Sequence, residues 1–324
     1  MKCRICNNDD GLMEYKIREM MLGLREIFSY YRCPVCGCLQ IADIPQDLEK
    51  YYPSGYYSYI NEQQSQFGLK KLLKIQRDKY VVFNKGITGK LLSFIFPDEE
   101  LVFFAGIDLK SRILDVGCGS GKLLNRLREL GFESVLGVDP YIDSSLEYPN
   151  GVRVEKKKLS DLNEKWDVIM FNHSFEHVSS PHEEISHVAD LLNESGLCII
   201  RTPVIDSFAW DFYKTDWVQI DAPRHLHIYS VESIKLLAEK VNLFLVRIYY
   251  DSGPFQFWGS EQYKNDIALN DEKSFSRNNG KSLFSRHDIR AFRKKSIELN
   301  RNNFGDQAVF FLKKRQPDFT LHSC

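Results

Sequence analysis

Arg112-Ile-Leu-Asp-Val-Gly-Cys-Gly-Ser-Gly-Lys122 is the stretch that decides the fold of this chain. Its apolar start predicts a buried strand, its alternating glycines predict a tight turn, and the leucines that follow at helical spacing predict a helix. Glycine lets the backbone approach a ligand closely, because no Cβ is in the way. Asp139 ends a second apolar strand, 22 residues after Gly117, and an acid at that distance suits a ribose diol. The stretch therefore predicts a strand, turn and helix that bind a nucleoside cofactor.

The glycine spacing separates two cofactor classes. Nicotinamide dinucleotide sites use Gly-x-Gly-x-x-Gly, and here Lys122 stands where the third glycine is needed. The order Asp115-x-Gly-x-Gly-x-Gly121 instead resembles motif I of the class I S-adenosylmethionine-dependent methyltransferases. The resemblance implies that S-adenosyl-L-methionine is the cofactor, that Asp115 and the glycine turn hold its methionine part, and that Asp139 holds its ribose. The expected cofactor-binding residues are Asp115, Gly117, Cys118, Gly119, Gly121, Asp139, Pro140, Asp161 and Asn172.

Composition bounds the remaining possibilities. The 324 residues are 43% hydrophobic and 27% charged, as in an ordinary globular protein, and are enough for one large core plus a small satellite domain. The net charge of -1 gives no overall electrostatic case for nucleic acid. No apolar run reaches the roughly 18 residues that predict a membrane span, and the N-terminus has no apolar signal core. The expected location is therefore cytoplasmic.

Two cysteine pairs near the N-terminus predict a metal site. Cys3, Cys6, Cys33 and Cys36 form two C-x-x-C knuckles separated by 26 residues. Zinc prefers four tetrahedral sulfurs, so the pattern predicts a structural Zn²⁺ site with no open position. Cys38 lies two residues further on and ranks below Cys36 as a ligand. The metal would supply folding energy that so short a segment cannot obtain from a core.

The order of predicted elements gives the architecture. Strand and helix patterns alternate between residues 111 and 203, which indicates a doubly wound sheet. Phe244–Tyr250 and Gln307–Leu312 predict two further strands, which resemble the closing hairpin of class I methyltransferases. The expected fold class is α/β, with a Rossmann-like seven-stranded sheet preceded by a four-cysteine zinc ribbon and a helical lead-in. The expected segments are a zinc-ribbon domain at 1–50, the lead-in at 51–110, and a methyltransferase domain at 111–324 with a helical insert at 252–305.

Three further stretches are less decisive. The tyrosines of 51–59 either line a sugar or adenosine pocket or form a packing turn. Leu69, Leu72, Leu73, Leu91 and Ile95 follow a helical pattern, and the lysines among them predict a solvated face. The cations of 281–301 predict either a helix that caps the domain or forms a homodimer, or a site for a diphosphate-bearing substrate.

Two histidine clusters stand where predicted strands end. The first is Asn172-His-Ser-Phe-Glu-His177, and the second is Arg224-His-Leu-His227. Methyl transfer to a hydroxyl or a carbon acid requires removal of a proton near pH 7, for which histidine is the usual base. The candidate catalytic residues are His225, His227, His173, Glu176 and His177.

Three interpretations of these clusters compete. His225-Leu-His227-Ile-Tyr-Ser230 resembles a His-x-His stretch of the sugar C-methyltransferases, in which a histidine acts as base; Leu226 replaces their glutamate, which favours methylation at oxygen. In the second interpretation, a metal site is formed by His173, Glu176, His177 and either His225 or His227. This pattern resembles the metal sites of small-RNA 2′-O-methyltransferases, with His173 in place of their first acid. Glu-His at this place also resembles the ubiquinone-pathway O-methyltransferases. In the third interpretation, Glu176 and His177 only fix the loop.

The acceptor is expected from resemblance. Zinc-ribbon methyltransferases of bacterial polysaccharide and deoxysugar synthesis share this order of domains, which implies an activated sugar or glycan end as a small-molecule acceptor. Trp210, Tyr213 and Trp217 either stack on that sugar or belong to the core. The alternatives are an RNA methyltransferase whose zinc domain grips RNA, and a non-catalytic binding module that keeps the fold.

Overall fold

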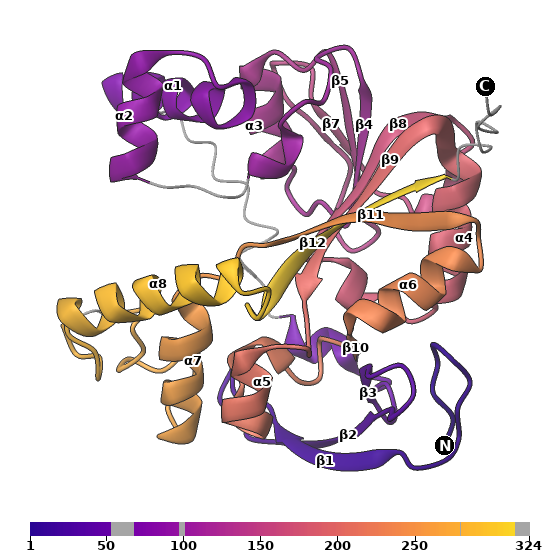
Figure 1. Ribbon diagram of the computed structural model, residues 1–324, viewed down its shortest axis with the longest axis vertical. Coiled ribbons are helices and arrows are strands. Elements are labelled where there is room, and N and C mark those ends of the chain that lie inside the picture. Colours follow the sequence, from indigo (N-terminus) through magenta and orange to yellow (C-terminus); the bar gives the residue numbers. More distant parts are fainter. Residues whose placement is uncertain (53–67, 97–100, 279, 315–324) are drawn as a thin grey trace, which may run out of the picture. The chain divides into compact units, whose positions relative to one another are not determined.

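The structure is a computed structural model that describes residues 1–52, 68–96, 101–278 and 280–314 (Figure 1). The chain divides into two compact units. Unit 1 comprises Met1–Ser54, Asn172–Asp190 and Leu197–Cys324, and unit 2 comprises Gly55–Phe171 and Leu191–Gly196.

Unit 2 is built on a mixed sheet. Its strands β4 (Arg112–Val116), β5 (Ser134–Val138), β7 (Arg153–Glu155) and β8 (Trp166–Asn172) run parallel, in the order β8-β4-β5-β7. The two-residue strand β6 (Leu146–Glu147), which the sequence did not predict, pairs antiparallel with β7. Helix α3 (Lys122–Leu130) follows the glycine turn and buries four leucines. The predicted α/β class and its mixed sheet are thus confirmed.

Two helices precede the first strand of unit 2. Helices α1 (Leu69–Phe83) and α2 (Ile87–Ile95) pack on each other, and a short 3-10 helix η2 (Val102–Phe104) follows. The carboxylate of Asp78 in α1 lies 3.1 Å from the guanidinium of Arg126 in α3, and both side chains are almost fully buried. The helical lead-in is therefore present and tied to the body of its unit.

Unit 1 contains a second, four-stranded sheet. Strands β1 (Met13–Arg18), β2 (Ile27–Arg32), β3 (Leu39–Ile41) and β10 (His227–Ile228) follow each other in that order, all antiparallel. Three strands come from the cysteine-bearing segment, and the fourth comes from the second histidine cluster. Residues 1–54 accordingly belong to one compact unit with residues 172–190 and 197–324.

The apolar core of unit 1 lies against this sheet. Trp210 and Tyr213 in α5 (Phe208–Tyr213) and the nearby Trp217 are buried in it together with Tyr30 and Ile41. Three aromatic side chains with this burial pack the core, so they do not support the sugar-stacking interpretation. Residues 214–220 continue as two 3-10 turns, η5 (Lys214–Asp216) and η6 (Val218–Ile220).

The rest of unit 1 contains an antiparallel group of strands. Strand β12 (Gln307–Lys314) pairs with β11 (Leu243–Tyr250) on one side and with β9 (Leu192–Pro203) on the other. Helices α4 (Pro181–Leu191) and α6 (Val231–Glu239) also belong to this part of the chain. The predicted insert between β11 and β12 contains α7 (Phe255–Lys264) and the basic helix α8 (Arg286–Arg301). The dimer and diphosphate interpretations of that insert both stay predictions.

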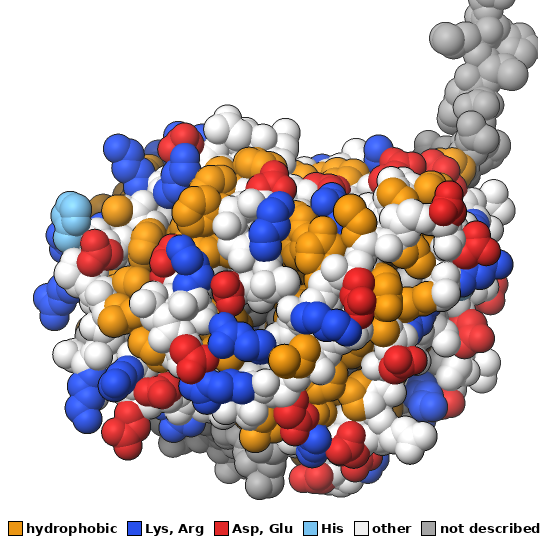
Figure 2. Space-filling model, turned by 90° about the horizontal axis from the view of Figure 1, so that it is seen from below, with side chains coloured by type: hydrophobic (Ala, Val, Ile, Leu, Met, Phe, Trp, Pro, Cys, Tyr) orange, Lys and Arg blue, Asp and Glu red, His pale blue; other side chains and the backbone are white. Residues whose placement is uncertain are grey.

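Three further observations bear on the expectations. Of the tyrosines in 51–59, only Tyr51, in the turn η1 (Leu48–Tyr51), and Tyr52 lie within the described residues. Within the described residues, no helix is both long enough and apolar enough to cross a membrane. On the face drawn in Figure 2, positive and negative side chains are interspersed, with no continuous basic field of the kind that RNA binding favours.

Candidate functional site

The glycine turn after β4 has the conformation that its sequence predicts. Gly119 and Gly121 have φ values of 54° and 71°, a left-handed region that side chains rarely adopt. A Cβ on Gly121 would also lie 2.6 Å from a methyl group of Val154 in β7. The backbone therefore turns directly from β4 into the N-terminus of α3, where amide groups are suited to face a ligand.

Asp139 is the acid that was expected to hold a ribose. It follows β5, is buried, and accepts hydrogen bonds from the backbone N–H of Gly119 and of Tyr141, each at 2.9 Å. An ionised carboxylate offers about four acceptor positions, so one such group is able to bind backbone amides and a ligand hydroxyl together. Asp115 at the end of β4 is equally buried. Both acids thus border the turn from neighbouring strands.

Cys118 and Pro140 complete this part of the turn. The Cys118 side chain packs on Gly137, where a Cβ would lie 2.4 Å from its sulfur. Burial raises the pKa of the Cys118 thiol, which therefore stays neutral at pH 7. Pro140, next to Asp139, is half-buried. The structure brings these residues together with the glycines, as the sequence suggested.

The remaining two predicted cofactor residues lie elsewhere. Asp161 is exposed in the turn η3 (Leu159–Asp161), and its carboxylate accepts the backbone N–H of Lys158 at 2.9 Å. Asn172 belongs to unit 1, where its side-chain oxygen accepts a hydrogen bond from Arg201 at 3.0 Å. Both side chains have local structural partners, and their roles toward a cofactor stay predictions.

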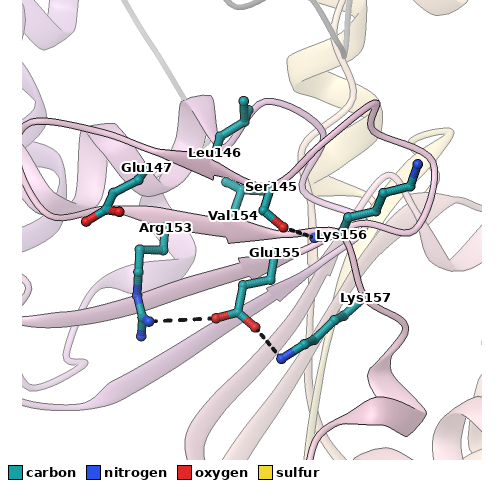
Figure 3. A pocket seen from close by; sticks show the side chains of 8 residues that line it. All are labelled: Ser145, Leu146, Glu147, Arg153, Val154, Glu155, Lys156 and Lys157. Atoms are coloured by element: carbon teal, nitrogen blue, oxygen red, sulfur yellow. Dashed lines mark hydrogen bonds and ion pairs between the residues drawn. The ribbon is translucent and has the colours of Figure 1, made fainter.

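A hollow of about 390 Å³ opens beside β6 and β7 of unit 2 (Figure 3). Glu155 is paired there with Lys157 at 2.8 Å and with Arg153 at 3.8 Å. None of the residues predicted to bind the cofactor lines this hollow. It is lined by Ser145, Leu146, Glu147, Arg153, Val154, Glu155, Lys156 and Lys157.

Four cysteines of unit 1 converge on one point. The sulfurs of Cys3 and Cys36 lie 3.5 Å apart, as do those of Cys6 and Cys33, and all four lie within 4.8 Å of one another. Sulfurs around a tetrahedral zinc with bonds of about 2.3 Å are about 3.8 Å apart, so the set fits this ion. Cys38 lies outside the group; its thiol is buried and directed to the carbonyl of Leu39. The structure thus favours Cys36 over Cys38.

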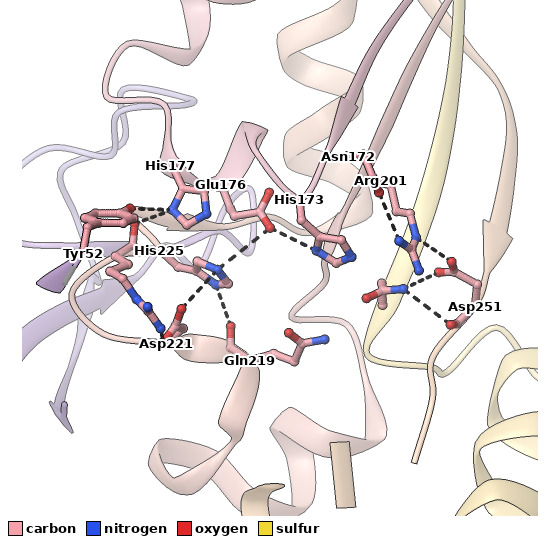
Figure 4. A network of polar contacts seen from close by, with 12 residues as sticks. Tyr52, Asn172, His173, Glu176, His177, Arg201, Gln219, Asp221, His225 and Asp251 are labelled. Atoms are coloured by element: carbon pink, nitrogen blue, oxygen red, sulfur yellow. Dashed lines mark hydrogen bonds and ion pairs between the residues drawn. The ribbon is translucent and has the colours of Figure 1, made fainter. Parts of the chain in front are cut away.

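The first histidine cluster forms a polar network with the second (Figure 4). His173, Glu176 and His177 come from the loop and the turn η4 (Phe175–His177) after β8, and the Leu226 N–H donates to the Glu176 carbonyl at 2.9 Å. This backbone bond places His225 beside Glu176. The groups of Glu176, His177 and His225 that are able to bind a metal ion lie within 4.8 Å of one another.

All three histidines of this network have the same tautomer. The Nδ1–H groups donate to oxygens: His173 to Glu176 at 3.3 Å, His177 to the Arg224 carbonyl at 2.8 Å, and His225 to the Gln219 carbonyl at 2.8 Å. Carbonyls and carboxylates only accept, so each Nδ1 must carry the proton. In the neutral form of each ring, Nε2 is then the atom that offers a lone pair to a proton or a metal ion.

Charge in this network is divided between its members. Burial opposes ionisation of Glu176, but its hydrogen bond with His173 and the nearby imidazoles lower its pKa to about 2. Burial lowers the pKa of His225 to about 4, so its imidazole is neutral at pH 7. Burial also opposes the charge of Asp221, whose pKa nevertheless falls below its usual value because of Arg224 and His225. The network therefore contains two stable carboxylates and a neutral imidazole.

His227, predicted as a catalytic residue, is separate from this network. It is fully buried in β10, pairs with Gln40 of β3, and stacks on Tyr229 with ring centroids 5.7 Å apart. Burial lowers its pKa to about 3. Its contacts are those of a residue that packs a sheet.

Sequence reasoning missed Asp221 and Gln219 as members of the network, and it offered Tyr52 only among the tyrosines of 51–59 that line a pocket or form a turn. Asp221 lies with one oxygen 3.7 Å from Nε2 of His225 and pairs with Arg224. Tyr52 places its hydroxyl 3.2 Å from Nδ1 of His177. Gln219 contributes a backbone carbonyl, which no sequence signal reveals. Asp221 could have been found from the spacing Asp221-x-x-Arg-His225, because this spacing puts an acid, a cation and an imidazole within one turn.

Comparison with known proteins identifies the class. Residues 91–248 match a family model described as a methyltransferase domain. This match covers just under half of the chain. Together with the glycine turn and its two acids, it supports an S-adenosylmethionine-dependent methyltransferase domain.

The alignments with individual relatives cover only part of each relative. A ubiquinone biosynthesis O-methyltransferase of Azorhizobium caulinodans is 31% identical over 151 residues, which cover 41% of this chain and 59% of that protein. A tRNA U34 carboxymethyltransferase of Pseudomonas fluorescens is 32% identical over 112 residues, which cover 31% of this chain and 35% of that protein. The chain thus spans less than two thirds of either relative.

Solved structures also match the chain. A cyclopropane synthase of Mycobacterium tuberculosis aligns with a TM-score of 0.43 and 16% identity, covering 84% of this chain and 95% of that one. An O-methyltransferase from a Brevibacillus brevis multienzyme, solved with S-adenosyl-L-homocysteine, aligns with a TM-score of 0.38 and 13% identity. The second alignment covers 76% of this chain and 73% of that one.

Proposed function

We propose that this protein transfers a methyl group from S-adenosyl-L-methionine to a hydroxyl of a small molecule. The observation that carries the proposal is the pair of buried acids, Asp115 and Asp139, beside a glycine turn within a matched methyltransferase domain. The Asp139 carboxylate is an acceptor suited to a ribose hydroxyl, and the turn offers backbone amides. A protein that kept this fold without binding a cofactor would not need two buried carboxylates at this edge of the sheet.

The supporting evidence for oxygen as acceptor atom is twofold. A relative named as an O-methyltransferase shares 31% identity, and Leu226 replaces the glutamate that the sugar C-methyltransferases have. The acceptor class that we propose first is an activated sugar or a glycan end. This choice rests on the shared order of a cysteine segment and a methyltransferase domain.

Proton removal falls to His173 in this proposal. Its Nδ1–H donates to Glu176, so Nε2 carries the lone pair, and about a third of the side chain is exposed. Glu176 orients the imidazole and stabilises its charged form, as the carboxylate does in a Ser-His-Asp triad. The acceptor oxygen forms a bond to the methyl carbon, the sulfur–methyl bond breaks, and the hydroxyl proton moves to Nε2. Bound S-adenosylmethionine supplies a leaving group that needs no further activation.

A metal-assisted mechanism is the second candidate, because His177 and His225 both donate Nδ1–H to backbone carbonyls. Metal-binding histidines typically have such partners, which direct Nε2 to the ion. The 3.9 Å between Nε2 of His225 and Oε1 of Glu176 suits two ligands of one ion, since bonds of about 2.1 Å allow separations up to about 4.2 Å. A divalent ion there would polarise the acceptor hydroxyl directly.

The cysteine site has a structural role in the proposal. Four sulfurs at this spacing leave zinc no open position, so the ion would hold the two knuckles together. Cysteine pairs that bind a metal instead of forming disulfides are typical of reducing compartments, which agrees with the cytoplasm as the proposed location.

Calorimetry and a product assay test the proposed function. Titration of the purified chain with S-adenosyl-L-methionine should give saturable binding, and release of S-adenosyl-L-homocysteine should rise with a nucleotide sugar or a hydroxylated aromatic acceptor. Chelation by EDTA should leave turnover intact for a histidine base and abolish it for the metal mechanism. Binding without turnover across the acceptors would support the non-catalytic module, and turnover on RNA alone would replace the acceptor class.

A further inference from the structure

Exposed apolar side chains concentrate in the hairpin of α1 and α2. Eight of the 19 large hydrophobic side chains that are exposed in the described residues belong to positions 68–96. Ile87 is 91% exposed, Phe94 is 78% exposed and Leu69 is 73% exposed. The other five are Leu72, Leu73, Leu91, Ile95 and Phe96. The predicted helices are therefore present, but these apolar side chains are exposed instead of packing in a core.

The exposed side chains lie on one face of each helix. Ile87, Leu91 and Phe94 stand at positions i, i+4 and i+7 of α2, and Leu69, Leu72 and Leu73 stand at i, i+3 and i+4 of α1. Residues at these spacings share a helix face. The start of α1 also borders a hollow of about 400 Å³ lined by Leu69, Leu72 and Ile75 together with Gly68 and Lys71. Large apolar side chains that are exposed together on a helix face are the kind of surface that marks an interaction site.

Charge separates the hairpin from the rest of the chain. Residues 68–96 contain six lysines, one arginine and one aspartate, which gives a net charge of +6. Because the whole chain carries -1, the remaining residues together carry -7. Lys70, Lys85 and Lys90 are exposed beside the apolar positions. The apolar face therefore has a strongly basic rim.

The hairpin is a firmly built part of unit 2. A Cβ on Gly89 of α2 would lie 2.3 Å from the carbonyl oxygen of Gln76 in α1, so the two helices cross at close contact. Asp78 binds Arg77 at 2.7 Å and Arg126 of α3 at 3.1 Å, and Lys71 pairs with Glu129 at 2.7 Å. Figure 1 shows α1 and α2 beside α3. The exposed face is thus presented by an ordered element.

We propose that the α1–α2 hairpin binds the surface of an anionic lipid membrane. Basic side chains around an apolar helix face are the combination that binds such surfaces, by burying apolar area and by attraction to anionic headgroups. The nine residues of α2 span about 14 Å, against about 30 Å of hydrocarbon, so the helix lies in the interface. A second copy of the chain is a less suitable occupant, because it would bring two hairpins of charge +6 together. RNA is also less suitable, because it would leave the apolar side chains of Ile87, Leu91 and Phe94 exposed.

Vesicle flotation tests the proposal with the full chain. Binding to phosphatidylglycerol vesicles should exceed binding to phosphatidylcholine vesicles by at least about tenfold and should weaken as salt is raised. Each lysine near an anionic surface contributes roughly fivefold, so Lys70→Gln, Lys85→Gln and Lys90→Gln together should weaken partitioning roughly 100-fold. Ile87→Ser, Leu91→Ser and Phe94→Ser together should weaken it at least about tenfold, without loss of folding, because all three side chains are exposed.

Matched variants outside the hairpin serve as controls. Lys273→Gln, Lys281→Gln and Lys294→Gln remove the same total charge from exposed positions, and Ile27→Ser, Val246→Ser and Leu283→Ser remove exposed apolar side chains. Both control sets should bind vesicles like the unmodified chain. Equal loss in control and hairpin variants, or equal binding to both lipids, overturns the proposal. So does a concentration-dependent dimer that the hairpin variants dissociate, since the face would then belong to a second copy.

Discussion

The carboxylate of Asp139 accepts the backbone N–H of Gly119 at 2.9 Å, which links the acid after β5 to the turn after β4. The same carboxylate also accepts the N–H of Tyr141 at 2.9 Å. One side chain therefore fixes the turn and presents the expected ribose contact. Its removal should affect both tasks at once.

Asp139→Asn should weaken S-adenosyl-L-methionine binding by about 10- to 100-fold, because a hydrogen bond to a charged acceptor contributes roughly 1.5–3 kcal/mol. Isothermal titration calorimetry measures the change. Asp143→Asn is the matched control, since Asp143 is exposed four residues further on, and it should change the affinity less than about threefold. Equal affinities of the two variants would remove Asp139 from the cofactor site.

Replacement of His173 by Gln should lower kcat at least about 100-fold and leave S-adenosyl-L-methionine affinity within about threefold, because general-base catalysis contributes about 10²–10⁴-fold. Glu176→Gln should lower kcat less than His173→Gln does, because it keeps the imidazole and removes only the carboxylate that orients it. Stopped assays from about pH 5 to about pH 9 measure both effects. A fall in affinity without a fall in kcat would assign His173 to binding.

One zinc ion per chain is expected, because only one group of four thiols converges within the described residues. Cys6→Ser and Cys33→Ser should each lose the ion and lower Tm, whereas Cys38→Ala should retain it. Elemental analysis and differential scanning fluorimetry measure the two quantities. Two metal ions per chain, with the second lost in His225→Gln, would favour the metal-assisted mechanism.

Acid should destabilise the fold between pH 6.5 and about 4. Burial lowers the pKa of His227 to about 3 and that of His225 to about 4, from an ordinary value near 6.5. In that window the unfolded chain binds protons that the native chain cannot, so unfolding becomes easier as pH falls. Each group contributes at most about 1.4 kcal/mol per pH unit.

Urea unfolding at several pH values measures this dependence. His227→Phe keeps an aromatic ring beside Tyr229 and removes one titrating group, so its free energy of unfolding should vary less with pH. An unchanged slope would mean that His227 is not neutral in the native state.

The elements of unit 2 could be predicted from the sequence because its local and periodic signals agree. The apolar run of β4, the glycines and the leucines of α3 all indicate one structure. The knuckle cysteines are equally local, since each C-x-x-C pair turns on itself. In each case the deciding contacts lie within a few residues or within one repeating pattern.

Long-range contacts explain what sequence reasoning missed. The pairing of β10 with β3, which buries His227, joins residues far apart in the chain and has no local signal. The pattern of α1 and α2 revealed the helices, yet periodicity alone does not tell whether an apolar face meets a core or remains exposed. The Gln219 carbonyl acts through its backbone, which no side-chain motif encodes.

The pairing of His227 with Gln40 also sets an order of events during synthesis. Some 187 residues separate the two positions, so the four-stranded sheet cannot be completed until the ribosome has made most of the chain. At about 5–20 residues per second, that delay is roughly 10–40 s. During this interval the cysteine knuckles are exposed without their final strand. A nascent chain that captures zinc early would protect these thiols from oxidation while it waits for the rest of the protein.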